Sequence, residues 1–563
     1  MLLKNFKLLI ILLLLLYQFP LYSKSIYNNA FKSKEVSKYF SALVSYGNYK
    51  NNEAIKFFKS SKTLINKHDV FLKKYIFSLI QEGEVNQAIK ELKDNVNNKN
   101  SDFFESHLLL LIDSLKKNDF KKSKYYLDKL SKYGSKGTLE LVIHESFKDY
   151  IYLFKNKKIS SNPSSFGNLS LINKTFQNCY IGSKSTNTFF LNLINSDEND
   201  SSRYIFFYIN YLIENDQFFK AEKIADRVDL LSGGLLISQA KDWVNNKKIN
   251  RFSEIFSCKN ELDILSEFLF IISNIYSTEK NIEMSNFYLN ISSFLNPKFT
   301  FNLTLLAENY YTIENYKRSE KVLRKLNDKD DLYYFWYKIK KKANIISKKE
   351  SEQKAFEYIS IKFEKIEKPT IKILFDMANI SKNFEEYKLA INYYNMILPY
   401  LSNRSAAYAD LLYRRGSSYE RLGEFKNSDE DLLHSLEIVP DDAYVLNYLA
   451  YSWLERDHNI NQAIKMLEEA YKQNKNDPYI LDSVGWAYYL VGDLDKAERF
   501  LKKAIQLMPG DPIVNDHYAD ILWKMDRKMQ AKYYWMSVLD FDRTEEKMKK
   551  DIHIKLLRGP NKI

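Results

Sequence analysis

Small and large apolar residues recur about every 34 residues along the last third of the chain. Four units show this pattern most clearly: Ala409–Asp442, Ala443–Asp477, Pro478–Asp511 and the stretch beginning at Pro512. In the third unit, the spacing i, i+3, i+4 and i+7 of one helix face is met by Leu481, Val484, Gly485 and Tyr488. A second such face carries Ala497, Leu501 and Ala504. The pattern predicts two helices per unit, with a turn at Gly492.

The small residues mark where two helices must approach closely, because a bulky side chain there would force them apart. A single hairpin cannot bury its apolar face alone, so neighbouring hairpins are expected to stack into a solenoid. The predicted repeat core consists of Gly416, Tyr419, Ala450, Trp453, Ala463, Gly485, Tyr488, Ala497, Ala504, Ala519 and Ala531.

Fainter small-residue anchors continue the spacing toward the N-terminus. They are Ala54, Ala88, Ser123, Ala221, Ser285, Ser319, Ala355 and Ala390. They predict degenerate helical repeats over 26–140 and 221–405, before the four well-formed repeats over 406–545. An irregular helical region is expected over 141–220, with a loop near 160–168, and a basic capping helix and tail over 546–563. With 14 Gly and 10 Pro in 563 residues and no sustained alternating pattern, the fold class is all-α.

The N-terminus has the pattern of an export signal. Lys4 and Lys7 precede an apolar run from Leu8 to Leu16, and a small residue at Ser23 and again at Ser25 provides a cleavage site. Residues 1–25 are therefore predicted to be a signal peptide that sends the chain to the periplasm or cell envelope. The alternative is an uncleaved segment that anchors the chain in the inner membrane.

Two cysteines, Cys179 and Cys258, are compatible with an oxidising compartment but form no framework. They would pair only if the solenoid brought them together, and two semi-buried thiols are the favoured expectation.

The formal net charge of +13 is unevenly distributed. Residues 409–542 hold 16 Lys and Arg against 24 Asp and Glu, so the positive excess lies elsewhere in the chain. With an export signal in front, a nucleic-acid partner is not expected. Peripheral contact of the basic portion with an envelope membrane or the cell wall stays open as an alternative.

Motifs for catalysis and for metal binding are missing from the sequence. The seven histidines form no His-Glu-x-x-His pair, and there is no Gly-x-Ser-x-Gly, phosphate-binding glycine loop or Cys-x-x-Cys. We therefore expect no enzyme activity, no catalytic residues, no metal and no cofactor. His517 is interpreted as a structural residue.

The third unit, with Ser483-Val484-Gly485-Trp486-Ala487 in its first helix, closely resembles the tetratricopeptide repeat. The stretch from Asn515 to Trp535 resembles the closing unit of exported tetratricopeptide proteins of Gram-negative bacteria, a likeness covering roughly residues 405–560. The resemblance implies a tetratricopeptide-type helical-hairpin solenoid after the N-terminal signal segment.

The resemblance also implies that the first helix of each unit lines a concave groove in which a partner binds. The residues at the corresponding places, called here the predicted groove residues, are Tyr413, Asn447, Tyr451, Tyr479, Asp482, Trp486, Tyr489, Asp516, Asp520 and Trp523. They make an acidic and aromatic surface that would favour a basic ligand. The alternative is that Trp486 and Tyr451 only pack between neighbouring hairpins.

The leading hypothesis is a non-enzymatic exported scaffold that binds a partner protein or peptide, in envelope assembly or maintenance. A glycan- or wall-binding repeat module is the first alternative, because a carboxylate beside an aromatic ring also binds sugars. A regulatory subunit of an envelope enzyme is the second.

Overall fold

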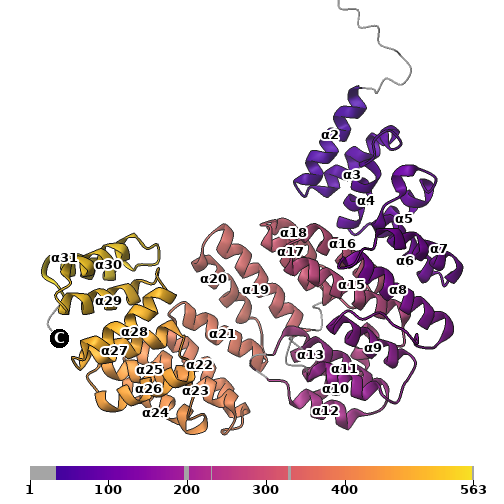
Figure 1. The fold of residues 1–563 in the computed structure, drawn as a ribbon. Coiled ribbons are helices and arrows are strands. Elements are labelled where there is room, and N and C mark those ends of the chain that lie inside the picture. The colour runs from indigo at the N-terminus through magenta and orange to yellow at the C-terminus, as the bar shows by residue number, and fades with distance from the viewer. Residues whose placement is uncertain (1–32, 196–201, 230, 232, 327–330, 561–563) are drawn as a thin grey trace, which may run out of the picture. The chain divides into compact units, whose positions relative to one another are not determined.

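The computed structural model describes residues 33–195, 202–229, 231, 233–326 and 331–560. All regular secondary structure in these ranges is helical, as the hydrophobic pattern predicts. Successive helices pair as antiparallel hairpins that stack on one another (Figure 1). The predicted signal segment, residues 1–25, lies outside the described residues.

The chain divides into two compact units, each made of two stretches of sequence. One unit comprises 1–195 and 252–322, and the other comprises 196–251 and 323–563. The segment 196–251 therefore belongs to the same unit as the C-terminal part of the chain, from which it is separated in the sequence by residues 252–322.

 The intervening residues, 252–322, belong to the other unit. Order along the chain therefore does not decide which unit a segment joins.

The first unit holds nine helices from its first stretch within the described residues. They are α2 (Ser33–Gly47), α3 (Asn51–Ser60), α4 (Phe71–Gln81), α5 (Val85–Asp94), α6 (Phe104–Lys116), α7 (Phe120–Leu130), α8 (Leu139–Asn156), α9 (Asn168–Tyr180) and α10 (Thr186–Ile194). Its second stretch adds α15 (Glu261–Thr278), α16 (Ile282–Leu295), α17 (Asn302–Thr312) and α18 (Tyr316–Leu323). Short 3-10 turns are η1 (Lys62–Leu64), η2 (Lys99–Ser101) and η3 (Ser131–Tyr133).

The second unit begins with α11 (Ser202–Glu214), α12 (Phe218–Asp226) and α13 (Leu235–Asn245), and α14 (Asn250–Ile255) leads out of it. It resumes with α19 (Leu332–Lys349), α20 (Glu352–Phe363), α21 (Ile371–Asn383), α22 (Tyr387–Ile397) and the 3-10 turn η4 (Leu398–Tyr400). The last nine helices are α23 (Ala406–Arg421), α24 (Phe425–Ile438), α25 (Ala443–Glu455), α26 (Ile460–Gln473), α27 (Pro478–Leu490), α28 (Leu494–Leu507), α29 (Pro512–Lys524), α30 (Lys528–Asp540) and α31 (Glu546–Arg558).

The small anchors of the sequence pattern lie inside these hairpins. Ala54, Ala88, Ser123, Ala221, Ser285 and Ala390 are fully buried, and Ser319 and Ala355 nearly so. In the C-terminal hairpins the same holds for Ala450, Ala463, Ala497, Ala504, Ala519 and Ala531. Trp453 is also buried, whereas Tyr419 and Tyr488 are only half-buried. The Tyr488 hydroxyl reaches Glu468 at the hairpin surface, which explains why this ring is not enclosed.

Glycine permits the closest helix contacts. A Cβ added at Gly485 of α27 would lie 2.7 Å from Cγ of Leu501 in α28, nearer than real Cβ atoms come. At Gly416 of α23, the added Cβ would lie 3.1 Å from Cγ of Leu432 in α24. In both hairpins, the two helices therefore approach most closely at a glycine, where there is no side chain to keep them apart.

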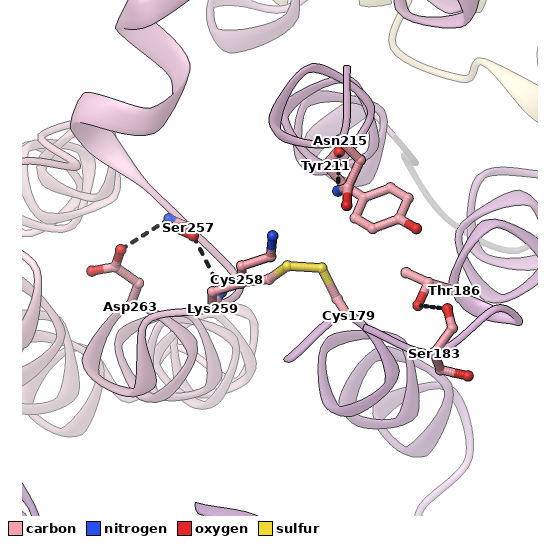
Figure 2. The surroundings of a disulfide bond; sticks show 9 residues. All are labelled: Cys179, Ser183, Thr186, Tyr211, Asn215, Ser257, Cys258, Lys259 and Asp263. Carbon is pink, nitrogen blue, oxygen red and sulfur yellow. Dashed lines mark hydrogen bonds between the residues drawn. A yellow bond between two sulfur atoms is a disulfide. The ribbon is translucent and has the colours of Figure 1, made fainter. Parts of the chain in front are cut away.

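The two cysteines are joined, contrary to the expectation of two semi-buried thiols. Cys179 at the end of α9 and Cys258 just before α15 form a disulfide within the first unit, with Cα atoms 5.9 Å apart (Figure 2). Because 79 positions separate them in the sequence, the bond ties the unit's two stretches together. Sequence spacing could not reveal this contact, since it depends on how the helices of the unit are stacked.

Candidate functional site

The first helices of the C-terminal hairpins start in a repeated way. Asp442, Asp477 and Asp511 precede α25, α27 and α29, and each carboxylate accepts hydrogen bonds from two backbone N–H groups of the first turn, at 2.9–3.2 Å. Pro478 and Pro512 occupy the first helical position, where no N–H is needed. These caps set the same starting point for each first helix, and so align the predicted groove residues from one hairpin to the next.

The predicted groove residues of α23 and α25, Tyr413, Asn447 and Tyr451, are all half-buried. The rings of Tyr413 and Tyr448 meet edge to face with centroids 5.8 Å apart. Tyr451 is half-buried, and burial together with Glu455 raises the pKa of its hydroxyl well above the ordinary value. Tyr413 and Tyr448 thus form a partly enclosed aromatic wall.

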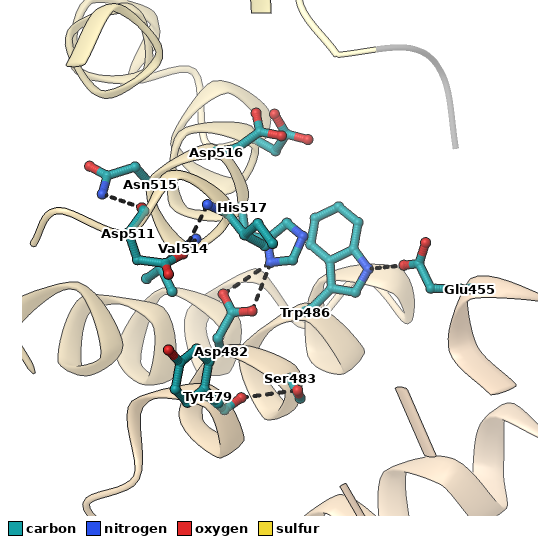
Figure 3. Close-up of polar contacts among 12 residues, drawn as sticks. Glu455, Tyr479, Asp482, Ser483, Trp486, Asp511, Val514, Asn515, Asp516 and His517 are labelled. Atoms are coloured by element: carbon teal, nitrogen blue, oxygen red, sulfur yellow. Dashed lines mark hydrogen bonds and ion pairs between the residues drawn. The ribbon is translucent and has the colours of Figure 1, made fainter. Parts of the chain in front are cut away.

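Asp482 and Trp486 of α27 are bound to neighbouring hairpins within the chain (Figure 3). Asp482 is buried, and Nδ1 of His517 lies 3.0 Å from both of its carboxylate oxygens. The imidazole ring stacks on Trp486 with centroids 4.1 Å apart. The Trp486 indole N–H donates to Glu455 at 3.2 Å. This supports the packing alternative for Trp486 and gives His517 the structural contacts expected of it.

The charge of this cluster depends on His517. Burial lowers the pKa of the imidazole, but the carboxylates of Asp482, Asp516 and Asp520 outweigh that effect, and the net direction is upward. A protonated His517 offsets the negative charge of Asp482. The carboxylate expected to attract a basic ligand is thus already paired.

The acidic residues of α29 are paired with a cation from the C-terminal helix. Nζ of Lys555 in α31 lies 2.7 Å from Asp516 Oδ1 and 2.8 Å from Asp520 Oδ2. The Trp535 indole N–H also donates to both carboxylates, at 3.0 and 3.2 Å. Burial and the neighbouring Asp516 raise the pKa of Asp520 to about 6. The expected open acidic surface is therefore covered here, and residues 546–558 supply its cation.

The three remaining predicted groove residues have contrasting surroundings. Tyr489 is buried and stacks on Trp486, with ring centroids 4.9 Å apart. Trp523 lies against the end of α31, because a Cβ added at Gly559 would fall 2.5 Å from its indole. In contrast, Tyr479 is 58% exposed, and so is its counterpart one unit earlier, Tyr444, at 57%. Among the aromatic residues of α25 and α27, these two tyrosines are the most exposed to solvent.

A basic cluster that sequence reasoning missed lies one hairpin earlier. Nζ of Lys382 in α21 is near Oγ of Ser417 in α23, at 2.5 Å, and 5.8 Å from the ring centre of Tyr413. Burial, together with the nearby guanidinium groups of Arg414 and Arg421, lowers the pKa of Lys382 to about 8. Nε of Arg414 donates to the Asp410 carboxylate at 2.9 Å. We call Lys382, Arg414 and Arg421 the basic cluster.

The position of Lys382 within its helix could have indicated this cluster from the sequence. Lys382 is the twelfth residue from Ile371, where α21 begins, and the twelfth place is one that the resemblance assigns to the groove. The step from Ala390 to Ser428 is 38 residues, because the turn η4 and the residues after it separate the two hairpins. The predicted groove residues all lie in the four units that begin at Ala409, so Lys382, which precedes them, was not among them.

Within the described residues, no group of three or more His, Cys, Asp or Glu side chains is placed to hold a metal ion. No helix in the same part of the chain is both long and apolar enough to cross a membrane.

Comparison with known proteins identifies the repeat. A family model described as tetratricopeptide repeat matches residues 346–543. A TPR repeat-containing protein of Pseudomonas aeruginosa is 37% identical over 100 residues, which are 18% of this chain and 17% of that protein. The chain thus matches only about a sixth of that relative's length.

Solved structures with similar folds have low sequence identity. A tetratricopeptide repeat protein from Parabacteroides merdae is 15% identical, with 46% of this chain and 98% of that chain covered and a TM-score of 0.38. A thermophilic TPR protein from Thermus thermophilus is 19% identical, with 33% and 100% covered and a TM-score of 0.30. A MamA fragment from Desulfovibrio magneticus is 17% identical, with 31% and 97% covered and a TM-score of 0.27.

Proposed function

We propose that this chain, whose residues 346–543 match the tetratricopeptide-repeat family model, is a non-enzymatic adaptor that holds a partner protein or peptide along α21 to α27. The partner lies across the first helices of several hairpins, as extended or helical peptides do in other grooves. The observation that carries this proposal is the basic cluster beside the aromatic wall of Tyr413 and Tyr448.

The charge of the surface favours an acidic partner over the basic one expected from the sequence. Lys382, Arg414 and Arg421 lie at one end, and the carboxylates at the other end are paired with His517 and Lys555. A half-buried ammonium attracts a carboxylate more strongly than an exposed one does, because less water screens it. Acidic side chains of the partner would pair with the basic cluster, and its apolar side chains would lie on the tyrosines.

The glycan-binding alternative depended on a free carboxylate beside an aromatic ring. Asp482 is bound to His517, and Asp520 to Lys555, so both carboxylates are engaged within the chain. This arrangement favours the protein partner. The alternative of a regulatory subunit of an envelope enzyme differs only in what the partner is.

We also propose that the protein is exported to the periplasm or the cell envelope. The Cys179–Cys258 disulfide supports this location, since such bonds persist in oxidising compartments and are rare in the cytosol. A C-terminal alkaline phosphatase fusion would be active only after export. An inactive fusion on a stably produced protein would contradict the proposed location. Cell fractionation then shows whether the exported chain is in the soluble periplasmic fraction or remains anchored in the membrane fraction.

Site-specific photo-crosslinking in cells tests the adaptor proposal. The probe is placed at the exposed Tyr479 or Tyr444, with Lys502 on α28 as the control position. We expect a discrete protein adduct from the tyrosine positions that Lys382→Glu abolishes and Lys388→Glu on α22 preserves. The identity of the adduct distinguishes an enzyme from other partners. Absence of any protein adduct, with binding of soluble wall fragments instead, would favour the glycan alternative.

A further inference from the structure

A cavity of about 740 Å³ lies in the second unit among α19, α20 and α21, beside the start of α13. Its apolar part is formed by the buried residues Trp336, Ala343, Ala355, Ile359 and Ile373. The exposed residues Asn344, Glu352 and Asn383 also line it, and they mark the side that opens to solvent.

The size and lining of this cavity are those of a ligand site. Protein cores leave few voids larger than a water molecule, whereas small-molecule sites measure about 300–1,000 Å³ and combine apolar walls with a few polar groups. Besides Trp336, four aromatic residues line it: Tyr333, Tyr337, Phe356 and Phe384. Phe356 and Phe384 stack with centroids 4.6 Å apart and make one flat wall.

The polar groups of the cavity converge on Asp376. Its carboxylate accepts from the Trp336 indole N–H at 2.9 Å and from Nζ of Lys340 at 2.5 Å. Nζ of Lys372 lies 3.3 Å from the same carboxylate and donates to the backbone carbonyl of Leu231 at 2.6 Å. The network fixes both ammonium groups at the cavity wall.

The cavity wall around Asp376 carries more positive than negative charge. The ammonium groups of Lys340 and Lys372 share the single carboxylate of Asp376. An ammonium group has three N–H donors, so Lys340 keeps donor capacity beyond its bond to Asp376. An incoming anion would complete the charge balance at this wall.

We propose that the cavity binds a small anion with an aromatic body, a carboxylate or a phosphate ester. The anionic group lies against Lys340 and Lys372, and the body packs on Trp336 and the wall of Phe356 and Phe384. This site differs from the adaptor surface in both its lining residues and its ligand, and it does not depend on the adaptor proposal.

Titration of the full chain with 1-anilinonaphthalene-8-sulfonate, an aromatic anion whose fluorescence rises on binding, tests the proposal. We expect saturable binding at one site, weakened about fivefold to tenfold by Lys340→Met. Lys348→Met, an exposed position on the same helix outside the cavity, should leave the affinity unchanged. The neutral dye N-phenyl-1-naphthylamine should bind the wild type and Lys340→Met alike.

A filled cavity provides the second arm. Asn344→Trp places a large ring at an exposed lining position and should abolish binding of both dyes, while circular dichroism and the melting temperature report that the fold is kept. Binding that persists in both Asn344→Trp and Lys340→Met would place the dye elsewhere and overturn the proposal. Absence of saturable binding to the wild type would overturn it too.

Competition identifies the body of the ligand. 1-Naphthoate should displace the bound dye, and octanoate should do so at clearly higher concentration, because the aromatic wall favours a flat ring. If octanoate competes better than 1-naphthoate, the aromatic body is wrong. If neither competes, the cavity does not select apolar carboxylates and the proposal fails.

Discussion

Lys555 of the C-terminal helix and Asp520 of α29 form a buried ion pair, with Nζ 2.8 Å from Oδ2. The side chain of Asp520 is 4% exposed and that of Lys555 18%. Asp516 shares the same ammonium, so one cation holds two carboxylates and fastens α31 to the end of the repeat array.

Removal of this cation should loosen the end of the array. Lys555→Met leaves Asp516 and Asp520 without their ammonium in a largely buried place, and we expect a loss of about 3 kcal/mol in the local stability of α29 to α31. Hydrogen exchange of these helices measures it. Lys550→Met, at an exposed position of α31, is the matched control. Equal protection in the two variants would show that the pair does not hold the helix.

The C-terminal hairpins should become less stable as the pH rises. The pKa of His517 is raised above its ordinary value and that of Asp520 is raised to about 6, so the folded state binds more protons than the unfolded state. Stability then decreases with pH, for Asp520 from about pH 4 to 6 and for His517 through its raised pKa. Hydrogen exchange of α27 and α29 at pH 5, 6, 7 and 8 measures the trend.

His517→Gln should flatten the upper part of this pH profile, whereas His434→Gln at an exposed position should not change it. A wild-type profile that rises between pH 5 and 8 would contradict the direction of both shifts.

Gly485→Ala should destabilise the third hairpin despite the better helix propensity of alanine. The new Cβ would lie 2.7 Å from Leu501 Cγ, and overpacking of this kind costs about 1–3 kcal/mol. Thermal unfolding followed by circular dichroism measures the loss. Gly510→Ala is the control, because an added Cβ there meets nothing within 4 Å. A melting temperature equal to that of the control would mean that α27 and α28 can move apart freely.

The disulfide should stabilise the first unit. Closing a loop between Cys179 and Cys258 restricts the unfolded chain, and the loop-entropy model gives about 4 kcal/mol for this length. Reductant should lower the melting temperature of the wild type and leave that of the Cys179→Ser, Cys258→Ser double variant unchanged. Two thiols that titrate in protein purified from an oxidising compartment without reductant would contradict the bond.

The sequence by itself determined the helical hairpins of the C-terminal array, because their signals are local. Gly485, Ala497 and Ala504 repeat at the spacing of helix contacts, and Pro478 and Pro512 mark where α27 and α29 begin. Each signal acts within one or two hairpins, so a periodic pattern is sufficient to predict it. The all-α class followed from the same pattern.

Only the tertiary structure decided which side chains remain available to a partner. Whether Asp482 and Asp520 attract a ligand depends on His517 and Lys555, which lie 35 residues further along the chain in each case. The Cys179–Cys258 bond and the joining of 196–251 with 323–563 depend on still longer separations. Such contacts arise from the stacking of hairpins, and helical periodicity carries no information about pairs so far apart, since it reports only which face of each helix is buried.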